Sequence, residues 1–207
     1  MPSVNVLRWI NGRGWLVLAG GADDDVRAMA INRSSADGGL AVIALDGSGD
    51  LLSDDLGDLG APSSYAVDVF TEDDDAVESK LAEAGVVVVS NTGSANEARS
   101  TLRGAAITGI QQAFENGAVI LLEGETAAAF GSWLVPLGDG LEWVEGALIL
   151  IGVQNTAARA KPVFDLHPAA VALAIEPGSA LALGPDGQIE PWGRGQVTIA
   201  LGSAFRT

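Results

Sequence analysis

The first two thirds of the chain alternate between short apolar runs and amphipathic stretches. Each apolar run has the length of a single buried strand. We predict strands at Trp15–Ala19, Leu40–Leu45, Tyr65–Phe70, Val86–Val89 and Ala118–Leu122. The run Val86–Val89 is β-branched throughout, which is typical of strands buried on both faces of a sheet. This alternation predicts right-handed crossovers between parallel strands of a doubly wound sheet.

Helix start and stop signals lie between these strands. Asp23–Asp25 supply a cap and an acidic first turn, where negative charge is favoured. Thr71 is placed to cap a later helix, and Gly85 is placed to end it. We also expect a short helix over Leu51–Leu59 and a long helical stretch over Ala95–Glu115.

The texture of the chain changes after residue 145. The segments "EGALILIGV", "AAVALAIEPGSALALG" and "GRGQVTIALG" read as short strands separated by Gly and Pro turns. They predict an antiparallel or mixed extension at one edge of the sheet. The chain shows no tandem repeat, low-complexity linker or break in composition, so we predict one domain over residues 1–207. The expected fold class is α/β, a three-layer α/β/α sandwich of flavodoxin-like type with a β-rich C-terminal edge.

Composition and charge exclude several classes of function. The chain carries 27 acidic and 11 basic residues, a formal net charge of −16, which repels nucleic acid and anionic membranes. It contains no cysteine, which excludes disulfides, thiolate metal sites and cysteine nucleophiles. It has neither a secretory leader pattern nor an apolar run of about 18 residues. We therefore expect a soluble cytoplasmic protein with no nucleic-acid or membrane partner.

The stretch "AVILLEGETAAAFGSWL" is the candidate catalytic segment. A buried strand turns at Gly124 and runs directly into a small-residue helical stretch, around a Gly-x-Thr-x-small core. Such a strand-to-helix turn is the setting of a nucleophile elbow, whose backbone N–H groups stabilise an oxyanion. We expect Thr126 at its apex.

The order of these segments resembles the cyanophycinase and aspartyl dipeptidase family of serine peptidases. The resemblance is carried by "GWLVLAGGADDD", by the stretch from "VVVVSNTGSANEARS" to "LLEGETAAAFG", and by a closing block that ends in "GRGQVTIAL". It implies a class I glutamine amidotransferase-like fold. It also implies that Thr126 stands where the family has its serine, in Gly124-Glu125-Thr126-Ala127-Ala128-Ala129 against Gly-x-Ser-Ala-Gly-Ala.

The resemblance further implies a degenerate catalytic triad. Where the family has its histidine, this chain has Gln154 and Asn155, neither of which titrates near neutral pH. Glu142 is the expected remnant of the family's acidic residue, with Asp139 and Glu145 as alternatives. A threonine side chain is also stiff and fits a strained elbow poorly.

Backbone donors for an oxyanion are expected from three residues. Thr92 and Gly93 stand where the family has a glycine pair, and Ala127 follows the expected apex. N–H donors do not depend on the side chain. The carboxylate of Glu125, in contrast, would bring negative charge towards an oxyanion and oppose amide hydrolysis.

Three further features have two interpretations each. His167, the single histidine of the chain, is either a displaced base or a turn histidine at the surface. The runs Asp23–Asp25 and Asp73–Asp75 suit either a hard metal ion or helix N-termini, and we expect no metal and no cofactor. Trp133 and Trp143 form either an exposed patch for self-association, as in a homodimer, or part of the core.

Two functional hypotheses follow from these residues. The first is a cyanophycinase-like protein that has lost peptidase activity and binds a small molecule or peptide at a vestigial cleft. The alternative is a divergent peptidase or amidohydrolase that uses Thr126 as its nucleophile. The alternative requires a base within hydrogen-bond reach of Thr126, and the sequence offers no obvious one.

Overall fold

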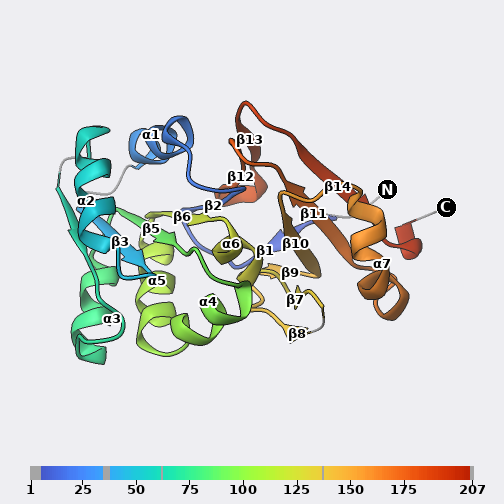
Figure 1. The fold of residues 1–207 in the computed structure, drawn as a ribbon, viewed down its shortest axis with the longest axis horizontal. Coiled ribbons are helices and arrows are strands. Elements are labelled where there is room, and N and C mark those ends of the chain that lie inside the picture. Colours follow the sequence, from blue (N-terminus) through green and yellow to red (C-terminus); the bar gives the residue numbers. More distant parts are fainter. Residues whose placement is uncertain (1–5, 35–37, 62, 137, 206–207) are drawn as a thin grey trace.

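A seven-stranded sheet crosses the computed structural model of the protein, which describes residues 6–34, 38–61, 63–136 and 138–205 (Figure 1). Its strand order is β13-β12-β2-β6-β5-β3-β4. The bounds are β2 Trp15–Ala19, β3 Leu40–Ala44, β4 Ser64–Ala66, β5 Val86–Ser90, β6 Val119–Glu123, β12 Ser179–Leu183 and β13 Ile189–Gly193. The strands from β2 to β4 are parallel, and β12 and β13 add an antiparallel edge beside β2.

Four of the expected strands are confirmed as parallel members of this one sheet. β2 pairs with β6, β6 with β5, and β5 with β3. The expectation for Tyr65–Phe70 is wrong beyond its start, because β4 ends at Ala66. There the Asp68 carboxylate accepts the Phe70 N–H at 2.9 Å and the Thr71 hydroxyl at 2.5 Å, and these bonds fold the chain into a turn.

The two faces of the sheet are covered by different helices. Alternate strand residues such as Val17 and Leu121 pack with α1 (Asp24–Arg33) and α2 (Gly49–Asp58). The intervening residues, such as Leu18 and Ile120, pack with α3 (Asp74–Ala82), α4 (Ala95–Leu102) and α5 (Ala105–Asn116). The side chains of a strand point alternately to opposite faces of the sheet, so each apolar run has side chains buried under helices on both faces. The expected three-layer α/β/α arrangement is confirmed (Figure 1).

The helix signals are confirmed in part. Asp23 caps α1 through a 3.0 Å hydrogen bond from the Val26 N–H. Thr71 does not cap α3, whose N-cap is Asp73, because its hydroxyl is engaged by Asp68. The stretch expected as one helix is two, α4 and α5, separated at Gly104, whose φ of +99° does not continue a helix.

The C-terminal third builds a second sheet as well as the edge of the first. The order of this second sheet is β14-β11-β10-β7-β8, and it lies beside the main sheet in Figure 1. Its bounds are β7 Trp133–Leu134, β8 Gly138–Asp139, β10 Ala147–Ile151, β11 Val171–Ile175 and β14 Val197–Leu201. Helix α7 (Thr156–Leu166), which the sequence reading did not predict, connects β10 to β11 and packs on this sheet. A short pair joins β1 (Arg8–Trp9) to β9 (Val144–Glu145).

None of the described helices is long and apolar enough to cross a bilayer.

Candidate functional site

The turn between β6 and helix α6 (Glu125–Ala129) carries the strained backbone expected of an elbow. Its strained residue is Gly124, with φ 62° and ψ −133°. Residues with a Cβ rarely adopt this conformation, although a Cβ on Gly124 would meet nothing closer than the Asn91 carbonyl oxygen at 4.0 Å. The apex is therefore Gly124, two residues before the expected Thr126. A glycine apex presents no side-chain nucleophile.

Thr126 lies in the first turn of α6 instead. Its side chain is fully buried, with 0% of the residue exposed. Its hydroxyl oxygen Oγ1 has no hydrogen-bond partner among the described residues. A substrate in solvent has no access to this oxygen in the structure.

Two of the three expected oxyanion donors are already engaged. The Gly93 N–H donates to Asn91 Oδ1 at 2.8 Å, and the Ala127 N–H donates to the Gly124 carbonyl oxygen at 2.9 Å. Thr92 is exposed in the same loop as Gly93. With the apex at Gly124, the residue whose N–H follows the apex is Glu125.

The loops beside the elbow hold their own polar groups. Hydrogen bonds from the Ser48 hydroxyl, at 2.6 Å, and from the Ser48 N–H, at 3.1 Å, lower the pKa of Asp46 below its ordinary value. At the start of α4, the N–H and hydroxyl of Ser94 lower the pKa of Glu97 in a capping box. These bonds fix the loops that follow β3 and β5.

The expected base and acid positions carry no titrating pair at the elbow. Gln154 is exposed after β10, and Asn155 caps α7 by accepting the Ala158 N–H at 3.3 Å. Glu142 is exposed in a turn with φ 60°. His167 ends α7 and stacks on Trp133, with 4.5 Å between ring centroids.

The elbow borders a small cleft. Its volume is about 220 Å³, and its two charged side chains are Glu125 and Arg159, both exposed. The rest of its wall is apolar: Ala95, Ala128, Leu134, Val135, Ile149–Ile151 and Val153. The cleft thus offers one carboxylate and one guanidinium on apolar surroundings, immediately after the apex glycine.

A buried ion pair below the elbow was missed by the sequence reading. Arg27 of α1 donates to Glu123 through Nε at 2.7 Å and through an Nη atom at 2.9 Å. The two side chains are 10% and 3% exposed, and the hydrogen bond to Glu123 raises the pKa of Arg27. The available signal was a lone glutamate ending an apolar run just before the turn. The pair ties α1 to the end of β6.

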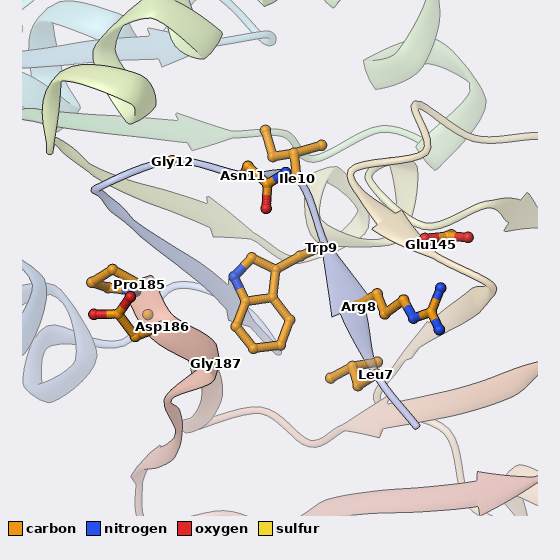
Figure 2. Close-up of a pocket in the computed structure, with 11 residues that line it drawn as sticks. Leu7, Arg8, Trp9, Ile10, Asn11, Gly12, Glu145, Pro185, Asp186 and Gly187 are labelled. Carbon is orange, nitrogen blue, oxygen red and sulfur yellow. The ribbon is translucent and has the colours of Figure 1, made fainter. Parts of the chain in front are cut away.

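A second hollow, of about 470 Å³, lies away from the elbow between β1 and the 3₁₀ turn Pro185–Gly187. Figure 2 shows the Trp9 indole projecting toward Pro185 and Asp186, and Arg8 projecting toward Glu145. Glu145, the alternative to Glu142 as acid remnant, lies opposite Arg8 in the register of β1 and β9 and lines this second hollow, away from the elbow.

The acidic runs and the two tryptophans each had two interpretations from sequence. Within the described ranges, no group of three or more His, Asp or Glu side chains is arranged to hold a metal ion. Asp23 caps α1, and Asp24 and Asp25 occupy its first turn. Trp143 is core, packed against Phe114 and Phe130, whereas Trp133 is half-buried.

The architecture is similar to that of solved peptidases. A peptidase from an acI-B1 Actinobacterium superimposes with a TM-score of 0.75, 16% identical residues and 93% of each chain covered. A putative peptidase E protein from Listeria monocytogenes EGD-e superimposes with a TM-score of 0.66 and 17% identity, over 88% of this chain and 99% of that one. The protein has a peptidase E-like fold. No protein-family model and no curated protein sequence matches the chain.

The peptidase E-like fold is of the class I glutamine amidotransferase-like type, as the sequence resemblance implied. Similarity at this level of identity concerns the fold, and the chemistry depends on the residues at the site. In this chain the elbow of that fold has a glycine apex, a buried threonine and a cleft with one charge of each sign.

Proposed function

We propose that this protein is a non-catalytic member of the peptidase E-like fold that binds a small molecule or peptide at the elbow cleft. The observation that carries the proposal is the strained turn at Gly124, with φ 62° and ψ −133°. The position from which an elbow presents its nucleophile holds no side chain.

The surroundings of the turn support the same conclusion. Covalent hydrolysis needs a nucleophile activated by a base within hydrogen-bond reach. Gln154 and Asn155 cannot accept a proton near neutral pH, and His167 is stacked on Trp133 at the end of α7. General-base assistance alone contributes about 10²–10⁴-fold to such reactions.

The cleft supports binding of a ligand with both charged and apolar parts. Arg159 suits a carboxylate and Glu125 suits an ammonium group, while the apolar wall suits a hydrocarbon side chain. A volume of about 220 Å³ admits a ligand no larger than an amino acid or a short peptide terminus.

The alternative function, hydrolysis with Thr126 as nucleophile, has one observation in its favour. The Thr126 hydroxyl is unpartnered, and a buried unsatisfied polar atom calls for an explanation. Its complete burial argues against it, because the elbow would have to open before Oγ1 met a substrate. A Thr126→Val variant separates the two functions, since it replaces the hydroxyl with a methyl group of similar size.

The decisive experiment assays purified protein against α-aspartyl, β-aspartyl and apolar dipeptides. We expect no hydrolysis above that of Thr126→Val, and none from Gly124→Ser, because neither variant gains a base. Hydrolysis by the unmodified protein that Thr126→Val abolishes would replace our proposal with the alternative.

Binding is tested with the same dipeptides by backbone amide NMR shifts. We expect shifts centred on Glu125 and Arg159, which Arg159→Gln weakens and Arg103→Gln, away from the cleft, leaves unchanged. The binding proposal fails if no dipeptide of the series shifts the cleft resonances.

A further inference from the structure

The outer strands of the two large sheets differ in how well their edges are protected. An exposed edge presents unpaired N–H and C=O groups, and proteins blunt such edges with short strands, charges or proline. Within the described residues, β4 and β8 are short, with three and two residues. β13 contains Glu190 and Pro191. Only β14, Val197–Leu201, combines five residues with no charge and no proline.

The hydrogen bonds at both ends of β14 show which of its backbone groups face outward. Gly202 donates to the Ala170 carbonyl oxygen, and the Glu176 N–H donates to Gln196. In an antiparallel ladder every second residue exchanges backbone hydrogen bonds with the partner strand. Since Gln196 and Gly202 are bonded, the residues of β14 that bond to β11 are Thr198 and Ala200. The N–H and C=O groups of Val197, Ile199 and Leu201 therefore point away from the sheet.

The edge of β13, unlike that of β14, is protected by Pro191. The bonds that flank its pairing with β12, from Arg194 to Gly178 and from Gly184 to Gln188, put Ala182 and Glu190 in the bonded register. Pro191 then faces outward, where it has no N–H to donate.

The side chains of the outward-facing residues form an apolar row on one face of β14. Ile199 is 51% exposed and Leu201 is 38% exposed, with Val197 half-buried beside them. Cross-strand apolar pairs stabilise sheets when a matching strand lies opposite. In a chain of net charge −16, this uncharged strand is also a place where two copies can approach.

We propose that β14 pairs with β14 of a second copy of this chain, in an antiparallel dimer centred on Ile199. In this register Ile199 lies opposite its own copy, and Val197 lies opposite Leu201 of the copy. All the outward N–H and C=O groups of both strands then find partners, and the two five-stranded sheets join into one. A two-fold axis requires such a self-complementary edge.

Strand pairing alone covers less than the roughly 1,200 Å² that a stable dimer buries. The surface next to the Leu201 end of β14 can supply more, because a cleft of about 550 Å³ lies there between exposed Val6 and Leu166. Gly202 and Ala204 bond to residues of the cleft wall, so it adjoins the strand directly. We expect micromolar affinity, strengthened by salt that screens the like net charges.

Sedimentation velocity over micromolar to submillimolar concentrations tests the dimer. Ile199→Lys places two ammonium groups opposite each other and raises the dissociation constant by about 100-fold. Ile189→Lys is the matched control, because Ile189 is 48% exposed on the edge strand β13. It leaves the dissociation constant unchanged.

Cross-linking tests the register with a variant that keeps the edge uncharged. The chain contains no cysteine, so Ile199→Cys introduces a single thiol on the two-fold axis. Bonded antiparallel pairs hold their Cα atoms about 5.5 Å apart, within disulfide range. Oxidation then yields a covalent dimer of Ile199→Cys much faster than of Ile189→Cys.

Three results would overturn the proposal. One is an unmodified protein that is monomeric at every concentration and salt level. Another is equal dissociation by the two lysine variants, and the third is equal cross-linking of the two cysteine variants. Circular dichroism confirms in each case that the variant is folded.

Discussion

Replacing Arg27 by methionine is expected to destabilise the protein strongly through the elbow. Arg27 is the side-chain hydrogen-bond partner of Glu123, which ends β6 immediately before Gly124. Arg27→Met keeps an unbranched apolar stem but leaves the Glu123 carboxylate, only 3% exposed, without its counter-charge. An uncompensated buried charge is costly because it has lost both water and partner.

The size of the loss follows from the geometry of the pair. Removing one partner of a buried ion pair costs about 3–5 kcal/mol. Each kcal/mol moves the unfolding temperature of a domain of this size by about 2–4 °C, so we expect a drop of about 6–20 °C. Exposed Asp24, 3.7 Å from Arg27, adds little because solvent screens it.

Urea unfolding followed by tryptophan fluorescence and circular dichroism measures this loss. Lys161→Met is the control, since Lys161 and Asp165 form a 2.6 Å pair on the exposed side of α7. We expect that variant to lose at most about 0.5 kcal/mol. Removing both charges, as in Arg27→Met with Glu123→Met, should recover most of the stability, because no buried charge is left unpaired.

Equal losses for Arg27→Met and Lys161→Met would refute this reasoning. Such a result would mean that water reaches Glu123 and that the pair does not hold α1 against β6.

Three smaller predictions concern the same edge of the sheet. Gly124→Ala should lose about 1–3 kcal/mol from backbone strain alone in urea unfolding, whereas Gly57→Ala, within helix α2, should not destabilise; equal effects would place no strain at the turn. Thr126→Val should keep or raise stability by about 1 kcal/mol, because it removes an unpartnered buried hydroxyl, and a clear loss would reveal a hidden partner. Hydrogen bonds from Ser48 lower the pKa of Asp46, so they stabilise the folded protein fully at any pH above the ordinary pKa of an aspartate. This stabilisation is lost as the pH falls through the lowered pKa of Asp46. Ser48→Ala should therefore be less stable than the unmodified protein near neutral pH, and the difference should vanish in acid. An NMR titration in which the Asp46 pKa of the variant is no higher than that of the unmodified protein would contradict this.

The parallel core of the fold could be predicted from sequence because its strands are short apolar runs with clear ends. Val86–Val89 and Ala118–Leu122 have no competing helical period, so length and β-branching decided them. The helix α7 was missed because "NTAARAKPVFDL" has a weak apolar period and an internal proline, Pro162. The division of the C-terminal strands between two sheets depends on pairing partners far apart in sequence, which periodicity cannot specify.

The sequence located the candidate site, but it placed the apex at Thr126, two residues after Gly124, where the structure has it. The motif reading aligned Gly124 with the family's first glycine, and this put Thr126 at the serine position. The backbone decides otherwise, because the left-handed φ falls on Gly124. A sequence shows where a glycine stands but not which φ it adopts, so the loss of the apex side chain was not visible in it.

The position of β2 in the sheet sets the order in which the molecule can be completed during synthesis. β2 is made before either of its neighbours, which come from residues 119–123 and 179–183. Loop closure over such separations is slow, and open strands in the meantime are prone to aggregation. A nascent chain that stops before Ser179 leaves Trp15–Ala19 with one bare edge. β12 therefore supplies the second neighbour of β2, and this part of the sheet closes only after residues 179–183 have been made.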